Sequence, residues 1–144
     1  MSKRDLSFFI IDIFVAIDKI RRYTDSFSDV QALLHSEINW DATIRKLEII
    51  GEATNKILQI TNDSSREKRR IIDFRNQISH GYFGIDENIV WDVIKHKLPL
   101  LYTGMIDLSR TIDLTQALKS VYEEHQHHPD ALQALEKIKA VTVS

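Results

Sequence analysis

Residues 6–20, LSFFIIDIFVAIDKI, predict one long helix that is apolar along most of its surface. Its main apolar stripe recurs at the spacing of a single helix face. The members of this stripe are Leu6, Phe9, Ile10, Ile13, Phe14, Ile17 and Ile20. A second stripe comprises Phe8, Ile11 and Val15. A helix with two apolar sides either lies at the centre of its bundle or shares one side with another subunit.

The remainder of the chain is also typical of helices. Only four glycines and two prolines occur in 144 residues, and no long stretch alternates with the period of a strand. We expect Thr24-Asp25-Ser26 to end the first helix and 29–35 to form a short second one. An apolar repeat then predicts a long helix from Trp40 to about Thr61, which contains Gly51. Beside it, Glu52 is either exposed or a partner for a buried cation such as Arg75.

Capping signals divide the second half of the chain. After a polar loop at 61–65, a helix is expected from Arg66 to His80, stopping at Gly81. Asp86 is a suitable N-cap for the next helix, which Pro99 should kink or break before helical spacing resumes as far as Ile112. A break at 125–129 precedes a short helix at about 129–139. We therefore predict an all-α, up-and-down bundle of four to six helices in one domain, residues 1–144, with a core at about 5–118.

Charge and composition limit the kinds of partner. The net charge is −2, so any binding of RNA needs a local basic patch. Residues 64–75 provide one, although such a run can equally be a solvated helix face. Its candidate RNA contacts are Arg66, Lys68, Arg69 and Arg70.

The chain has no cysteine, which excludes disulfides and thiolate metal sites and fits the cytoplasm. Asp5, Asp12 and Asp18 interrupt the first apolar run, so neither a signal peptide nor a membrane span is expected.

The segment Arg75-Asn76-Gln77-Ile78-Ser79-His80-Gly81-Tyr82 carries the groups best suited to chemistry. A guanidinium pairs with phosphate oxygens, and an imidazole transfers protons near neutral pH, so together they indicate phosphodiester cleavage. On an ideal helix the two side chains are about 140° apart. They converge on one phosphate only if the helix tightens near Gly81 or a second copy completes the site. The alternative is an ordinary helix end, with Arg75 paired to an acid.

Metal-dependent chemistry is not expected. His125, His127 and His128 follow two glutamates, but a short tract near a terminus is more often solvated. The carboxylates near the central segment have no spacing that converges on one face, which argues against a two-metal nuclease. They are Asp73, Asp86, Glu87 and Asp92. Trp40 and Trp91 are expected in the core or an interface rather than stacked on bases.

The motif Arg-Asn-x3-His-x-Tyr at 75–82, followed by Phe-Gly-Ile-Asp and preceded by Ile-Gly-Glu-Ala at 50–53, resembles the HepT-like branch of the HEPN ribonucleases. The resemblance extends from about Leu6 to Arg110. It implies a homodimeric ribonuclease that needs no metal or cofactor, with Arg75, Asn76 and His80 as the catalytic set.

The resemblance further implies the toxin of a type VII-like toxin–antitoxin pair. A minimal nucleotidyltransferase antitoxin would transfer AMP from ATP to Tyr82. The alternative interpretation of Tyr82 is a buried side chain that anchors its loop. The substrate would be RNA, with tRNA favoured over mRNA. Two alternatives remain: a non-catalytic substrate-binding or scaffold subunit of a nucleotidyltransferase, and a purely structural dimerisation bundle.

The chemistry itself favours a dimer. Cleavage through the ribose 2′-hydroxyl needs a base for that hydroxyl and an acid for the departing 5′-oxygen. One chain offers one motif histidine, and two chains offer a pair. Arg75 of each chain would stabilise the charge of the phosphorane, and the expected product is a 2′,3′-cyclic phosphate.

Overall fold

A computed structural model describes residues 3–61, 69 and 86–142. In these ranges the regular structure is helical throughout, which confirms the all-α prediction. The elements are α1 (Lys3–Thr24), α2 (Val30–His35), α3 (Glu37–Ile60), α5 (Glu87–Asp92), a π-helical turn η1 (Val93–Lys97), α6 (Leu98–Ser109), α7 (Thr115–Glu124) and α8 (Pro129–Thr142).

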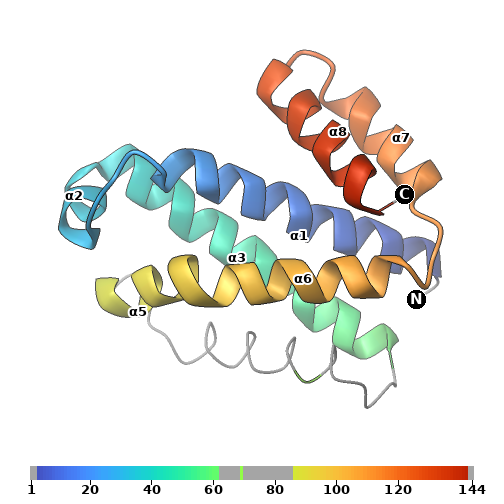
Figure 1. Ribbon diagram of the computed structural model, residues 1–144, viewed down its shortest axis with the longest axis horizontal. Helices are drawn as coiled ribbons and strands as arrows, with labels where there is room; N and C mark the ends of the chain where they lie inside the picture. Colours follow the sequence, from blue (N-terminus) through green and yellow to red (C-terminus); the bar gives the residue numbers. More distant parts are fainter. Residues whose placement is uncertain (1–2, 62–68, 70–85, 143–144) are drawn as a thin grey trace.

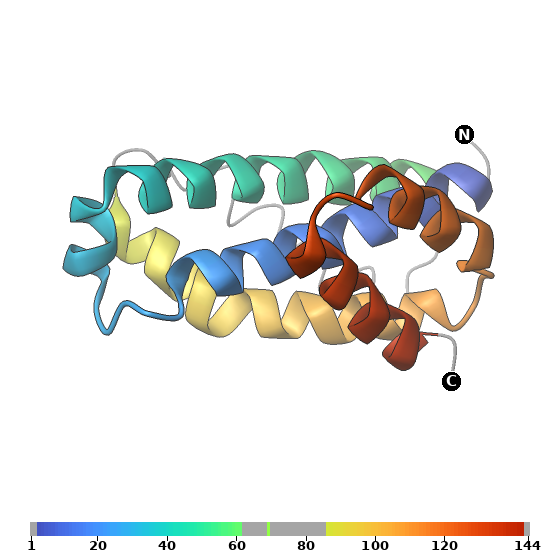
Figure 2. The same cartoon turned by 90° about the horizontal axis from the view of Figure 1, so that it is seen from above.

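Helix α1 is the central element of the bundle. It packs along most of its length on α3, and it also contacts α6, α7 and α8 (Figures 1 and 2). Ile11 from its second apolar stripe is fully buried, and Phe8 and Val15 pack against the core. The second stripe is therefore covered by helices of the same chain, as expected for a central helix.

Helices α2 and α3 begin and end close to the predicted residues. Asp29 caps α2 by accepting a hydrogen bond from the Ala32 N–H at 2.9 Å. At the start of α3, the Asn39 side-chain amide donates to the Tyr23 carbonyl at 2.8 Å and so ties this helix to the end of α1. The predicted apolar face of α3 is buried at Trp40, Thr43, Leu47, Ile50, Ala53 and Ile57.

Asp86 and Pro99 shape the next helical run. Asp86 is the predicted N-cap of α5. Pro99 neither breaks nor ends the run; instead η1 precedes α6, and the Leu98 N–H bonds to the Val93 carbonyl five residues back. In a regular α-helix Pro99 could not donate to the carbonyl of Lys95, and its ring would clash there. The wider turn accommodates the proline within a continuous helical segment.

The last two helices form a hairpin that packs on α1 (Figure 2). Helix α6 ends at Ser109, so Ile112 lies in the connection rather than in the helix. Asp113 then accepts from the Thr115 N–H at 2.9 Å where α7 begins. Helix α8 starts at the predicted break and continues three residues beyond 139.

No helix in the described ranges combines the length and the apolar composition needed to cross a bilayer.

Candidate functional site

The predicted catalytic segment, 75–82, lies wholly outside the described residues, and so does most of the basic run before it. Arg69 is described: it is helical and its side chain is exposed, as an RNA contact requires. The other predicted site residues fall between 62 and 85, outside the described ranges, so their roles and mutual placement stay predictions. They are Arg66, Lys68, Arg70, Arg75, Asn76, His80 and Tyr82.

The structure fixes the two points between which this segment runs. On one side, Thr61 ends α3: its N–H and its hydroxyl both donate to the Ile57 carbonyl at 2.9 Å. On the other side, Asp86 Oδ1 accepts from the N–H groups of Asn88 at 2.9 Å and Ile89 at 3.4 Å. The end of α3 and the start of α5 lie at opposite ends of the bundle (Figures 1 and 2).

The Ile-Gly-Glu-Ala segment occupies the middle of α3. Ile50 and Ala53 point into the core, whereas Glu52 is exposed. Its exposure agrees with the first of the two roles considered for Glu52; pairing with Arg75, which lies outside the described ranges, stays a prediction. The Gly51 carbonyl accepts a hydrogen bond from the Thr54 hydroxyl at 2.9 Å, so the buried hydroxyl of Thr54 has a partner within the helix.

Two of the four carboxylates considered as metal ligands, Asp86 and Glu87, have other partners. Asp86 caps α5, and Glu87 Oε1 accepts from the Gln31 side chain of α2 at 3.3 Å. Asp73 lies outside the described ranges. His125 Nδ1 is 2.8 Å from the Val121 carbonyl, and its ring meets that of His128 edge-on with centroids 6.3 Å apart. Among the described residues, no three His, Asp or Glu side chains are grouped as a metal site would require.

The two tryptophans are packing residues, as predicted. Trp40 is buried in the core, and Trp91 is half-buried against it. The Lys95 ammonium lies 4.6 Å from the centroid of the Trp91 ring. This lysine–tryptophan contact was not anticipated, although a spacing of four residues on a helix is the signal that predicts it.

A polar hollow of about 370 Å³ lies between the end of α1 and the α7–α8 turn. Burial lowers the pKa of Lys19 below its ordinary value; Lys46 and then Arg22 lower it further, and Asp18 opposes them. Arg22 Nε is 2.9 Å from the Asp18 carboxylate, and a second guanidinium nitrogen is 3.8 Å from Asp130. The lining thus contains Lys19 and Arg22 but also Glu124 and Asp130, which gives the hollow little net preference for an anion.

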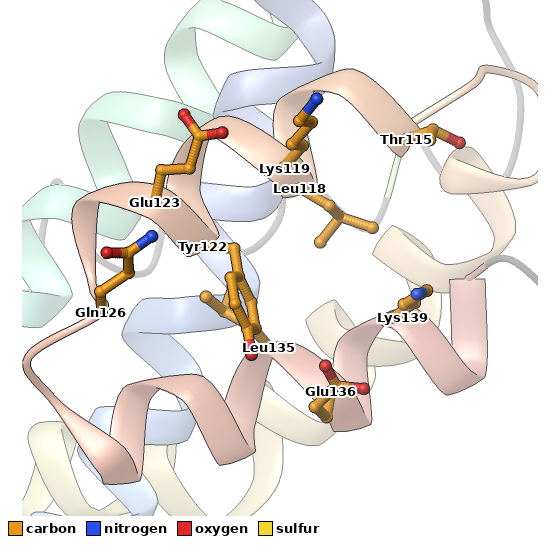
Figure 3. A pocket seen from close by; sticks show the side chains of 9 residues that line it. All are labelled: Thr115, Leu118, Lys119, Tyr122, Glu123, Gln126, Leu135, Glu136 and Lys139. Carbon is orange, nitrogen blue, oxygen red and sulfur yellow. The ribbon is translucent and has the colours of Figure 1, made fainter.

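A second hollow, of about 450 Å³, lies along the α7–α8 hairpin. Leu118, Tyr122 and Leu135 form its apolar part (Figure 3). Two lysines and two glutamates surround them: Lys119, Glu123, Glu136 and Lys139. Since these charges are also balanced, neither hollow resembles a binding site for a polyanion.

Comparison with known proteins identifies the family. The sequence model of the family described as "Ribonuclease HepT-like" matches residues 13–106, a range that includes the whole of 75–82. "Putative RNase MJ1380" of Methanocaldococcus jannaschii is 34% identical over 105 residues, which cover 69% of this chain and 92% of that protein. "Probable ribonuclease HepT" of Thermococcus cleftensis is 33% identical over 104 residues, covering 69% of this chain and 91% of that protein.

No solved structure matches the chain. The α7–α8 hairpin lies beyond the range of the family match, whereas α3, α5, η1 and the segment 62–85 lie within it. The match covers well over half of the sequence, and the relatives named above exceed 30% identity. The chain belongs to the HepT-like ribonuclease family.

Proposed function

We propose that this protein is a metal-independent endoribonuclease that cleaves RNA by attack of the ribose 2′-hydroxyl on the adjacent phosphorus. The observation that carries the proposal is the intact Arg75-Asn76-x3-His80-x-Tyr82 motif inside the family match. Family membership supports ribonuclease activity, and the motif supplies the groups that the reaction needs.

Each motif residue has a role in this reaction. One His80 imidazole takes the proton of the 2′-hydroxyl as its oxygen forms a bond to phosphorus, and a protonated His80 gives a proton to the 5′-oxygen as that bond breaks. Arg75 stabilises the charge that develops on the phosphate oxygens. Asn76 holds the orientation of His80. Because one chain has a single motif histidine, the active form is a homodimer with two motifs at one cleft.

The proposal includes a regulatory modification of Tyr82. A nucleotidyltransferase antitoxin attaches AMP from ATP to the phenol oxygen, with pyrophosphate leaving. An unperturbed phenol has a pKa near 10 and is a poor base at neutral pH, which favours a role as acceptor. The added phosphate would repel and exclude the RNA backbone. Among RNA substrates we favour tRNA.

Cleavage of RNA in the presence of EDTA tests the catalytic proposal. We expect the wild type to cut and the His80→Ala variant to be slower by about 10²–10⁴-fold, the usual contribution of general acid–base catalysis. His127→Ala is the matched control, because His127 is exposed beyond the family match. Equal rates for the His80→Ala and wild-type proteins would show that His80 is not catalytic. A wild type that binds a nucleotidyltransferase but never cuts would instead favour the scaffold alternative.

Mass spectrometry after co-expression with the neighbouring nucleotidyltransferase tests the modification. We expect a mass increase of one or more AMP units on the peptide that contains Tyr82, and none on the Tyr82→Phe variant. Modification elsewhere on the chain would refute the assignment of Tyr82 without affecting the assignment of His80.

A further inference from the structure

The π-helical turn η1 presents a short run of basic side chains, Lys95, His96 and Lys97, which we call the basic turn. Lys95 and His96 are exposed and Lys97 is half-buried. The preceding residues of the same turn, Val93 and Ile94, are buried in the core. The turn thus has one apolar edge that anchors it and one basic edge that faces solvent.

The charges of the basic turn are not neutralised within the described part of the chain. The ion pairs found there involve Arg22, Arg45 and Arg110, and none involves Lys95 or Lys97. Asp86, Glu87 and Asp92 are the neighbouring carboxylates in the sequence, and none of them forms an ion pair in the described ranges; Asp86 caps α5, and Glu87 accepts a hydrogen bond from Gln31. Lys95 and Lys97 therefore place two positive charges, outside any ion pair of the described residues, on one edge of a protein whose net charge is −2.

An aromatic ring accompanies these cations. The Lys95 ammonium lies over the Trp91 ring, which favours one placement of an otherwise mobile side chain. Lysine interacts with phosphate as a point charge, so the distance of its ammonium from the phosphate matters more than the direction of its N–H bonds. Lysines placed along a surface are typical of proteins that follow the phosphate backbone of a single-stranded nucleic acid.

We infer that the basic turn binds backbone phosphates of the RNA substrate, so that the RNA-binding surface continues beyond the predicted motif. The inference rests on the proposed ribonuclease function. Helix α5, which leads into the basic turn, begins five residues after Tyr82, and the Asp86 cap fixes its start. Contacts of this kind set the position of the RNA without reading its sequence.

Salt dependence of RNA binding tests the inference. The ligand is a fluorescent, 2′-O-methylated single strand, which keeps the phosphates but lacks the attacking hydroxyl. The probe variant is Lys95→Gln/Lys97→Gln, and fluorescence anisotropy gives the dissociation constant between 50 and 200 mM KCl. Each lost phosphate contact on a single strand should reduce the slope of log K against log salt by about 0.7, so the double variant should lose about 1.4. Over this range the wild type should then lose about sevenfold more affinity than the variant.

The matched control is Lys137→Gln/Lys139→Gln on α8, which makes the same change in net charge at two exposed lysines beyond the family match. We expect its slope to equal that of the wild type. Equal slopes for the wild type and the Lys95→Gln/Lys97→Gln variant, equal decreases in both variants, or no RNA binding by the wild type would overturn the inference. Cleavage of unmodified RNA by the wild type, measured in parallel, separates the two proposals. An unchanged slope in the Lys95→Gln/Lys97→Gln variant with normal wild-type cleavage refutes RNA binding by the basic turn alone. A reduced slope in that variant without wild-type cleavage refutes the proposed nuclease activity alone.

Discussion

Replacing Asp86 by alanine should loosen the start of α5, directly after the predicted catalytic segment. The carboxylate accepts hydrogen bonds from two N–H groups that have no partner within the helix, those of Asn88 at 2.9 Å and Ile89 at 3.4 Å. Helix α5 has only six residues before η1 begins, so this cap satisfies a large share of its first turn. In Asp86→Ala both donors lose their acceptor.

The expected loss follows from known capping energies. Replacing an N-cap by alanine costs about 0.5–2 kcal/mol, typically about 1. The carboxylate also interacts with the helix dipole, which contributes about 0.3–1 kcal/mol at an exposed position. Asp86→Asn keeps an acceptor oxygen and loses only the charge, so it should cost less than Asp86→Ala. For a domain of this size, 1 kcal/mol lowers the melting temperature by roughly 4 °C.

Urea denaturation gives the global effect, and amide hydrogen exchange locates it. At a cost of about 1 kcal/mol, the Asn88 and Ile89 amides of Asp86→Ala should exchange about fivefold faster. Asp29→Ala is the control, because Asp29 caps α2 in the same way through the Ala32 N–H. That variant should accelerate Ala32 and leave Asn88 and Ile89 unchanged. Unaltered exchange at both α5 amides in Asp86→Ala would refute the capping argument.

Three further predictions concern stability. Phe14 is fully buried and meets Tyr102 edge-on with centroids 5.1 Å apart, so Phe14→Ala should cost about 3–5 kcal/mol by urea denaturation; a cost below 1 would contradict its place in the core. Gly104 is buried within α6 and an added Cβ would meet no atom of the described residues within 4 Å, so Gly104→Ala should stabilise by about 0.5–1 kcal/mol, and destabilisation would refute this. Desolvation, followed by the carboxylate of Glu124, raises the pKa of Asp12 above 3.8. A carboxyl whose pKa is raised by folding stabilises the protein fully only below its pKa in the unfolded chain, and this stability is lost as the pH rises through its pKa in the folded chain. Asp12→Asn should therefore be more stable than the wild type at neutral pH in urea denaturation, by a small amount because Asp12 is exposed. The difference should vanish on acidification.

The sequence predicted most of the helices because their signals are local. The Asp29 and Asp86 caps and the polar residues after Thr24 each act over a single turn of helix, and the first apolar stripe repeats from one turn to the next. Their positions in the structure follow the predictions within one or two residues. The two-sided apolar pattern of α1 did not show whether its second side packs within the chain or against another subunit. The structure shows that α1 packs on α3, α6, α7 and α8 of the same chain.

Two features depended on information that a linear pattern lacks. The break between α6 and α7 contains no glycine or proline; the side chain of Asp113 marks it, with a hydrogen bond to the Thr115 N–H. Pro99 predicted a disturbance but not its form. Burial of Val93, Ile94 and Leu98 on one side of the run favours a wider turn over a break.

The candidate site was predicted in its residue types rather than in its geometry. A guanidinium, an amide, an imidazole and a phenol within eight residues predict phosphodiester cleavage, and the family match supports a ribonuclease. Convergence of Arg75 and His80 on one phosphate would depend on the path of the chain between 62 and 85 or on the second subunit that we propose. The basic turn was not predicted, because the sequence alone does not show that Val93 and Ile94 are buried while Lys95 and His96 are exposed.

A mixed dimer tests the shared cleft most directly. Two affinity tags allow purification of dimers that contain one wild-type and one His80→Ala subunit, and their initial rate of RNA cleavage is compared with that of the wild-type dimer. If both imidazoles serve one scissile bond, the mixed dimer should lose about 10²–10⁴-fold, because either the base or the acid is missing. A rate of half the wild-type value would show that each subunit cuts alone and would contradict the shared cleft.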